Sequence, residues 1–297
     1  MGRPQPGHPL RGADGRAGDP ARQRPVGLRK GRGLTETRTI RTDDGASIAV
    51  HLDGPAGAPA LTFTHSIAAS SAMWKPQVQS FGDRFRIVRV DFRGHGGSSV
   101  APAPDGFDRL AADVVAIWDA LDIARSHYVG LSLGGIVGAA LGLGHGDRLD
   151  RLVLADCRFD AAPGYLDMWR KRRAQVDQGG TKAIAAEVLA TWLTPETRSA
   201  FPELAAEISA GIEATDDDGW RNIVQIFPTL DYKKRLDRIE APTMFVCGSE
   251  DIVRGEMREC ARLVPGAKFE ILEKAAHIAS LDQPQAFDRL LANFLRS

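Results

Sequence analysis

One short stretch constrains the fold more than any other part of this sequence. Residues 126–131 form an apolar run that breaks at a Gly-x-Ser-x-Gly motif centred on Ser132, and residues 133–143 continue with small side chains at helical periodicity. This motif between a strand and a helix predicts a tight turn whose serine takes strained backbone angles and projects its hydroxyl group. We interpret Ser132 as a candidate nucleophile. A glycine-rich turn that packs a helix against a sheet is the alternative.

Strand-like and helical segments alternate along most of the chain. The strand-like segments, rich in Val, Ile, Leu and Phe, are residues 60–64, 86–91, 126–131, 149–156, 242–248 and 268–272. The helical segments are residues 72–81, 110–121, 133–143, 255–263 and 285–295. Residues 35–42 and 46–53 alternate in polarity around an Asp-Asp-Gly turn, which predicts a hairpin. The pattern predicts an α/β fold with a mainly parallel sheet, helices on both faces, and functional loops at the C-terminal ends of the strands.

One interval breaks this alternation. Between residues 159 and 235 four segments favour helix and none favours a sheet strand: 168–176, 182–192, 203–212 and 219–226. We therefore expect a core made of residues 34–158 and 236–297, with residues 159–235 inserted as a helical cap over Ser132. Its aromatic side chains either line a pocket under the cap or form the core of the cap: Trp169, Trp192, Trp220 and Phe227.

A serine nucleophile needs a base that takes its proton and a carboxylate that orients this base. Asp251 follows the predicted strand at 242–248, and His277 follows the last predicted strand. The order Ser132, Asp251, His277 is the order of the nucleophile, acid and base in α/β-hydrolases. Helix capping by Asp251 and a turn role for His277 are the alternatives, and Asp156, also at a strand end, is the rival acid.

Acyl transfer also needs two N–H groups that stabilise the developing oxyanion. The backbone N–H of Leu133 lies at the start of the helix predicted at 133–143, where N–H groups have no helical acceptor. We assign the second donor to the backbone N–H of Ile67, in the loop after the strand at 60–64. His65 in the same loop is interpreted as a structural hydrogen-bonding residue and not as a second base.

Composition narrows the classes of partner. The chain has 297 residues, 43% of them hydrophobic, and equal numbers of basic and acidic side chains. A zero net charge gives no reason to expect nucleic acid or an anionic membrane as partner, and no apolar run is long enough to span a membrane. The three cysteines, Cys157, Cys247 and Cys260, have neither a metal-ligand spacing nor a disulfide framework. We expect a cytoplasmic monomer or small homo-oligomer that binds no metal.

Residues 1–33 differ from the rest of the chain. They contain eight Arg and Lys against two Asp, with eight Gly and five Pro. Such a segment buries no core and has no apolar region typical of a secretory signal. We expect a disordered tail, and a basic arm that contacts an acidic partner is the alternative.

Several motifs together resemble the α/β-hydrolase superfamily over residues 35–297. They are the Asp-Phe-Arg-Gly-His-Gly-Gly-Ser at 91–98, the tight turn around Ser132 at 130–135, which we call the elbow, residues 248–251 and the Ala-His at 276–277. Within it, the chain is similar to the 3-oxoadipate enol-lactonases of aromatic catabolism at 65–74, 91–98, 190–195 and 241–243. The resemblance implies hydrolysis of a small carboxylated lactone by Ser132 and His277, without metal or cofactor.

Substrate contacts are less constrained. Arg158 follows a predicted strand and either binds a substrate carboxylate or bridges to Asp156 or Asp160. Trp192 is a second candidate contact, from the cap. A general carboxylesterase or another lactonase would use the same nucleophile, acid and base. A carbon–carbon bond hydrolase and a slow, hydrolase-like ligand receptor are further alternatives.

Overall fold

The computed structural model describes residues 1–2 and 35–296. Among these residues eight strands form one sheet in the order β1-β2-β4-β3-β5-β6-β7-β8. The strands are β1 (Glu36–Arg41), β2 (Ser47–Asp53), β3 (Ala60–Thr64), β4 (Arg86–Val90), β5 (Ser126–Leu131), β6 (Leu149–Ala155), β7 (Thr243–Gly248) and β8 (Lys268–Leu272). The β1–β2 and β2–β4 pairs are antiparallel, and the other pairs are parallel. This confirms the predicted hairpin and the mainly parallel sheet.

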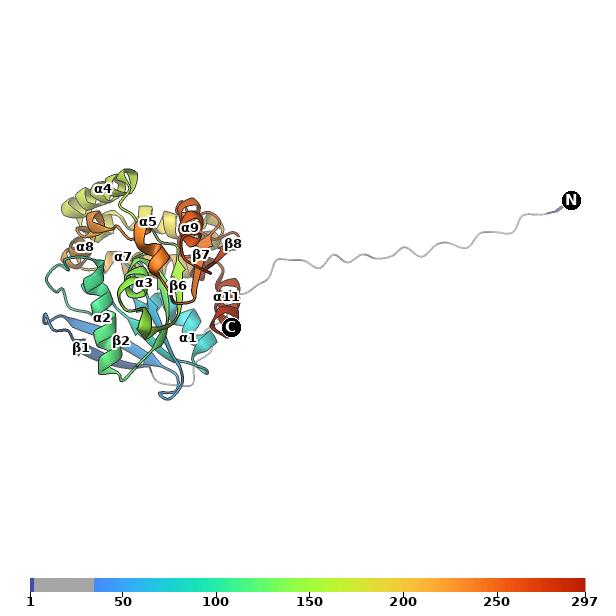
Figure 1. The fold of residues 1–297 in the computed structure, drawn as a ribbon. Coiled ribbons are helices and arrows are strands. Elements are labelled where there is room, and N and C mark those ends of the chain that lie inside the picture. The colour runs from blue at the N-terminus through green and yellow to red at the C-terminus, as the bar shows by residue number, and fades with distance from the viewer. Residues whose placement is uncertain (3–34, 297) are drawn as a thin grey trace. The chain divides into compact units, whose positions relative to one another are not determined.

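Helices follow most of the strands (Figure 1). The α-helices are α1 (Lys75–Phe81), α2 (Phe107–Ala120), α3 (Leu133–Gly144), α4 (Pro163–Gly179), α5 (Ala185–Trp192), α6 (Pro195–Ala200), α7 (Pro202–Glu213), α8 (Asp217–Val224), α9 (Arg254–Ala261), α10 (Ala279–Asp282) and α11 (Pro284–Arg296). The 3₁₀ helices are η1 (Ser71–Trp74), η2 (Gly146–Arg148), η3 (Thr181–Ala183), η4 (Phe227–Thr229) and η5 (Lys233–Arg238). The sequence pattern missed the short helices α6 and α10, because a helix of one or two turns carries almost no periodic signal.

The two faces of the sheet bury different helices, because successive side chains of a strand point in opposite directions. On one face the indole N–H of Trp118 in α2 donates to the hydroxyl of Thr62 in β3 at 2.9 Å, and α3 packs beside α2. On the other face the ring centroid of Phe63 in β3 lies 4.9 Å from that of Trp74, which in turn lies 6.0 Å from the ring centroid of Phe287 in α11. The predicted helices on both faces are therefore confirmed.

Helices α4 to α8 lie between β6 and β7 in the sequence, and those that Figure 1 labels, α4, α5, α7 and α8, lie together at the upper left of the view. An isolated antiparallel bridge between Asp160 and Asp231 joins the two ends of this helical segment. The N–H of Tyr232 reinforces the bridge by donating to the carbonyl of Phe159 at 2.9 Å. The segment therefore leaves and rejoins the sheet region at one place.

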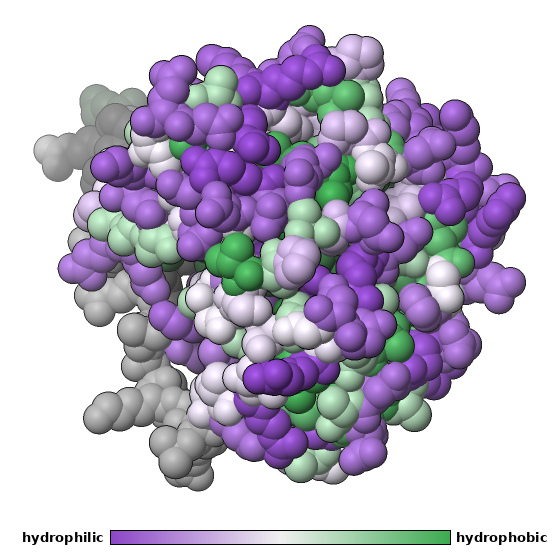
Figure 2. Space-filling model, turned by 90° about the vertical axis from the view of Figure 1, so that its left-hand side faces the viewer, coloured by the Kyte–Doolittle hydropathy of each residue, from purple (hydrophilic) through white to green (hydrophobic). Residues whose placement is uncertain are grey.

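The surface carries scattered apolar side chains. Figure 2 shows a face that is mostly hydrophilic, with small and separated apolar areas. Within residues 1–2 and 35–296, none of the helices combines the length and apolarity that crossing a membrane requires. The predicted tail, residues 1–33, lies outside the described residues except for its first two.

Candidate active site

The elbow after β5 holds Ser132 in a strained backbone conformation. Its φ is +56° and its ψ is −110°, outside the regions that residues other than glycine ordinarily occupy. Such a conformation costs about 1–3 kcal/mol and persists only where surrounding structure enforces it. Here the N–H of Ser132 donates to the carbonyl of Ala155 at the end of β6 at 2.8 Å, so the elbow is fastened to the neighbouring strand.

Glycines flank Ser132 because no side chain fits there. A Cβ on Gly130 would lie 2.0 Å from the carbonyl oxygen of Gly134. A Cβ on Gly134 would lie 2.6 Å from the carbonyl oxygen of Thr64 in β3. The two motif glycines therefore let the first turn of α3 approach both β5 and β3.

Ser132, His277 and Asp251 form a continuous hydrogen-bonded chain. His277 Nδ1 lies 2.7 Å from Asp251 Oδ2, and His277 Nε2 lies 2.9 Å from Ser132 Oγ. Because a carboxylate only accepts, the Nδ1–H group donates to Asp251, and Nε2 is free to accept the hydroxyl proton of Ser132. The structure thus brings together the three residues that the sequence identified separately.

Asp251 is buried, with 2% of its side chain exposed, whereas 20% of the His277 side chain is exposed. Burial alone would raise the pKa of Asp251, but the charge and hydrogen bond of His277 outweigh burial and hold this pKa below its ordinary value. The N–H of Val253 donates to Asp251 Oδ1 at 3.1 Å, which also favours the anion. Asp251 is therefore the charged member of the chain.

The loop that carries His277 is bonded to the helical segment between β6 and β7. The N–H of Ile278 donates to the carbonyl of Trp192 at 2.9 Å, at the C-terminal end of α5. The carboxylate of Asp282 accepts the N–H of Ala276 at 2.7 Å and the N–H of Thr194 at 3.2 Å. These bonds couple the position of His277 to that of α5. Sequence reasoning missed Asp282, because no motif marks it.

Asp156, the rival acid, lies beside the chain and not in it. It follows β6, is fully buried, and its Oδ1 accepts the N–H of Gly248 at 2.8 Å. Its Oδ2 has no hydrogen-bond partner within the described residues. Burial and the nearby charge of Asp251 raise the pKa of Asp156 well above its ordinary value. It makes no hydrogen bond to His277, whose Nδ1 pairs with Asp251.

The loop after β3, which contains Ile67, is hydrogen-bonded to the start of α3. The N–H of Gly134 donates to the carbonyl of His65 at 3.1 Å, which joins this loop to the first turn of α3. In the described part of the chain, neither the N–H of Ile67 nor that of Leu133 has a hydrogen-bond acceptor. Neither of the two N–H groups predicted as oxyanion donors is therefore bonded to another group of the described residues.

Two buried histidines hold this loop. His65 Nδ1 donates to the carbonyl of Ser66 at 2.7 Å, and its Nε2 accepts the N–H of Phe92 at 2.9 Å, which fits the structural role expected for it. His95 Nε2 accepts the N–H of Ala68 at 3.0 Å. Burial and the neighbouring His65 lower the pKa of His95 to about 3, so its ring stays neutral and keeps this acceptor. His95 belongs to the 91–98 motif, but the sequence alone predicted no role for it.

Arg158 is occupied within the chain. Its guanidinium forms ion pairs with Glu256 and, at 3.3 Å, with Asp160, and it stacks 5.0 Å from the ring centroid of Tyr165. These contacts favour the intramolecular bridge, with Glu256 as an additional partner that sequence reasoning did not identify. Burial raises the pKa of Glu256 to about 6 despite the opposing charge of Arg158.

The aromatic side chains of the helical segment are buried against one another. Trp169 stacks on Phe227 with ring centroids 4.4 Å apart and lies 6.1 Å from Trp220. This packing favours a core role for these three residues. Trp192 is also buried, but it ends α5 beside the His277 loop.

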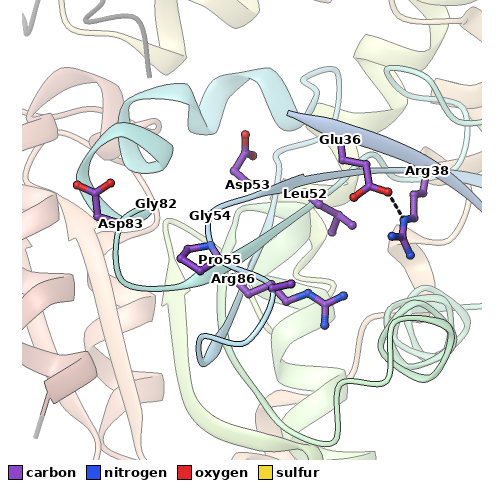
Figure 3. Close-up of a pocket in the computed structure, with 10 residues that line it drawn as sticks. Glu36, Arg38, Leu52, Asp53, Gly54, Pro55, Gly82, Asp83 and Arg86 are labelled. Carbon is purple, nitrogen blue, oxygen red and sulfur yellow. Dashed lines mark hydrogen bonds and ion pairs between the residues drawn. The ribbon is translucent and has the colours of Figure 1, made fainter. Parts of the chain in front are cut away.

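A surface depression of about 320 Å³ lies away from this site (Figure 3). Asp53 and Arg86 line it, together with the Glu36 and Arg38 pair. Arg86 begins β4, whereas Ser132 follows the C-terminal end of β5, so the depression lies at the opposite edge of the parallel strands. None of the predicted site residues lines it.

Comparison with known proteins places this geometry in context. A family model described as the alpha/beta hydrolase fold matches residues 59–284. The chain is 30% identical over 239 residues to 3-oxoadipate enol-lactonase 2 of Acinetobacter baylyi, covering 79% of this chain and 88% of that protein. A hydrolase structure from Pseudomonas aeruginosa PA01 aligns with a TM-score of 0.83 and 35% identity, covering 88% of this chain and 98% of that one. The enol-lactonase structure from Burkholderia xenovorans LB400 aligns with a TM-score of 0.82 and 29% identity, covering 88% and 100%.

Proposed function

The chain belongs to the α/β-hydrolase family, and from this premise we propose that it is a serine hydrolase that cleaves a carboxylic ester or lactone through an acyl-enzyme. The observation that carries the proposal is the unbroken chain of hydrogen bonds from Ser132 Oγ through His277 to Asp251. Its position at a strained strand-to-helix elbow supports the same conclusion.

In the proposed reaction, Ser132 Oγ attacks the carbonyl carbon of the substrate while its proton passes to His277 Nε2. Asp251 stabilises the imidazolium that forms. The bond between the carbonyl carbon and the leaving oxygen then breaks, and His277 returns the proton to that oxygen. Water, deprotonated by His277, attacks the acyl carbon, and Ser132 Oγ leaves with the proton.

The N–H groups of Ile67 and Leu133 bind the carbonyl oxygen as it becomes an anion. Their lack of acceptors within the described residues supports this assignment, because an N–H already bonded within the protein is not available to the substrate. Losing one such donor typically costs about 2.7–4 kcal/mol of transition-state stabilisation. The reaction requires no metal and no cofactor.

Residues 159–235 act as a cap over this site, inserted into a core made of residues 34–158 and 236–297. The bonds between the C-terminal end of α5 and the His277 loop support this role. At the other side of the cap, α8 contacts the 91–98 loop so closely that a Cβ on Gly94 would lie 2.2 Å from the Cα of Gly219. Trp192, which ends α5 beside the His277 loop, is the proposed substrate contact from the cap.

The substrate proposed first is the enol-lactone of 3-oxoadipate, in aromatic catabolism. The similarity to enol-lactonases over most of the chain supports it. The ion pairs of Arg158 leave its guanidinium less available for a substrate carboxylate. Either another cationic side chain binds this carboxylate, or the substrate is a lactone with a different ring. A general carboxylesterase or another lactonase is the second candidate, because it would use the same three residues.

A hydrolysis screen with enol-lactones, saturated lactones and aryl esters tests the proposal. Turnover of enol-lactones at least about tenfold above the other classes supports the lactonase, since small differences in a pocket are worth about 10–200-fold. Equal turnover of aryl esters supports the carboxylesterase. Turnover of none of these classes, together with no labelling of Ser132 by an alkyl phosphonate, would contradict a serine hydrolase.

We further propose a cytoplasmic location. Cys157, Cys247 and Cys260 are all buried and unpaired, as expected for a protein of a reducing compartment.

A further inference from the structure

Two buried carboxyl groups lie side by side behind His277. Asp156 ends β6 and Asp251 follows β7, and these strands are parallel neighbours. A carboxylate oxygen of each residue and the sulfur of Cys247 all lie within 4.8 Å of one another. Asp156 is fully buried, and only 2% of the Asp251 side chain is exposed.

The two carboxyl groups have different hydrogen-bond partners. Asp251 accepts two donors, from His277 and from the N–H of Val253, as an anion does. Asp156 accepts one donor at Oδ1, from the N–H of Gly248, and its buried Oδ2 has none. An anion with one oxygen buried and unpaired is strongly disfavoured, and a second anion beside Asp251 is disfavoured further.

The other groups around Asp156 add no compensating positive charge. Cys157 and Cys247 are the titratable neighbours besides Asp251, and burial raises the pKa of both thiols, so both stay neutral. The Cys247 thiol lowers the pKa of Asp156, but burial and the charge of Asp251 raise this pKa by more. His277 pairs with Asp251, and it makes no hydrogen bond to Asp156. Nothing among the described neighbours stabilises a charged Asp156 as His277 stabilises Asp251.

We propose that Asp156 holds a proton on Oδ2 and directs it toward Asp251, acting as a neutral positioning residue behind the Ser132, His277 and Asp251 chain. The expected effect on kcat rests on the function proposed above, whereas the position of the proton does not. Oδ1 stays anchored to the N–H of Gly248, while the protonated oxygen holds the Asp251 carboxylate in the orientation that faces His277. Asp251 then remains the single anion that meets the imidazolium.

Replacement by asparagine tests the charge of Asp156. In Asp156→Asn the amide oxygen can accept the N–H of Gly248, and the amide N–H₂ can donate toward Asp251, as the protonated acid does. The readout is the titration midpoint of the His277 ring, followed by NMR and assigned with His277→Gln. We expect the midpoint to move by less than about 0.3 pH units, because one neutral group replaces another. A fall of about one unit or more would overturn the proposal, because it would show that an anion was removed.

Replacement by leucine removes the donor. In Asp156→Leu we expect kcat to fall about tenfold with little change in KM, because Asp251 loses a group that orients it. The His277 midpoint should rise, since Asp251 without its donor attracts the imidazolium more strongly. A fall of the midpoint would contradict the proposal. If this variant does not fold, the asparagine variant still decides the question.

The NMR measurement needs no turnover, so the two proposals fail in different ways. Absence of hydrolysis with an unchanged His277 midpoint in Asp156→Asn contradicts the proposed reaction and leaves the proton assignment standing. Hydrolysis in the wild type with a lowered midpoint in Asp156→Asn overturns the proton assignment alone.

Discussion

At the scale of single residues, Ser132 combines a costly backbone conformation with a hydroxyl bonded to an acceptor. Its positive φ is maintained by Gly130 and Gly134, and its Oγ lies 2.9 Å from His277 Nε2. The same conformation would be strained for any residue with a Cβ, so serine contributes its hydroxyl group here and brings no backbone preference for this turn.

Ser132→Ala should therefore remove hydrolysis and leave the fold intact. We expect turnover to fall about 10⁴-fold or more, because the acyl-enzyme has no other nucleophile. The free energy of unfolding should change by less than about 1 kcal/mol, since alanine keeps the Cβ and removes one partly exposed hydroxyl. Steady-state kinetics and urea unfolding measure the two effects.

Ser209→Ala, on the exposed side of α7, is the matched control and should leave turnover unchanged. A folded Ser132→Ala enzyme with more than about a hundredth of wild-type turnover would contradict the nucleophile assignment.

Asp251→Asn should lower kcat by about 10³–10⁴-fold, because His277 loses the carboxylate that sets its tautomer and stabilises its charge. Asp156→Asn should lower kcat by less than about threefold, since the variant keeps a neutral group at this position. Both variants change one carboxyl group to an amide, so each serves as the control for the other. If Asp156→Asn had the larger effect, Asp156 would be the acid partner of His277.

At the scale of elements, α3 shows which glycines the elbow requires. Gly134→Ala should destabilise the protein by about 2 kcal/mol or more, because its Cβ would overlap the backbone of Thr64 and β3 would have to shift. Gly144 in the last turn of the same helix has open space around its Cβ position. Gly144→Ala should be neutral or stabilising by up to about 1 kcal/mol. Urea unfolding of both variants measures the contrast, and equal effects would show that the elbow tolerates a side chain.

The free energy of unfolding should fall at acidic pH, because His95, which holds the loop after β3, is neutral in the folded protein. The pKa of His95 is lowered to about 3 by burial and by His65, whereas an unfolded chain protonates histidine near its ordinary pKa of about 6.5. Between these values the unfolded chain binds a proton that the folded protein excludes. Stabilisation by neutral His95 is therefore fully present above about pH 6.5 and is lost as the pH falls toward about 3.

His95→Gln isolates this effect, because its amide can replace both hydrogen bonds of the ring and does not titrate. At about pH 7 we expect the variant to be less stable than the wild type, and at about pH 5 its deficit should shrink by about 2 kcal/mol. Urea unfolding at the two pH values measures the difference. A deficit that stays constant with pH would show that His95 is protonated in the folded protein or does not hold the loop.

At the scale of the whole molecule, β1 is paired with β2 along its whole length. Each residue of β1 pairs with β2, and residues 1–33 are rich in glycine, proline and arginine. Deleting residues 1–33 should therefore leave the melting temperature and turnover nearly unchanged, because every core residue and strand pair among residues 35–296 is kept.

Thermal melting and steady-state kinetics of the truncated protein, at low and at physiological salt, measure this prediction. A loss of activity that depends on salt would contradict it, because it would indicate that the basic segment contacts acidic groups such as Asp217 and Asp218. Size-exclusion chromatography of both proteins would test the expected monomer or small homo-oligomer.

The sequence by itself determined the order of strands and helices, the elbow, and the three residues of the hydrogen-bonded chain. Periodicity and glycine placement are local properties, and the C-terminal ends of parallel strands must meet at one edge, so strand-end positions were enough to select Ser132, Asp251 and His277. The sequence ranked Asp251 above Asp156, but only the tertiary structure shows which carboxylate pairs with His277, because both residues follow neighbouring strands.

Other features depended on tertiary contacts alone. Arg158 faces Glu256, nearly a hundred residues away in sequence, and no local pattern signals such a pair. The hold of His95 on Ala68 and of Asp282 on Ala276 likewise depends on how loops pack. A hydrogen bond between side chain and backbone leaves no periodic trace in a sequence, so only the folded chain reveals which polar residues support the site.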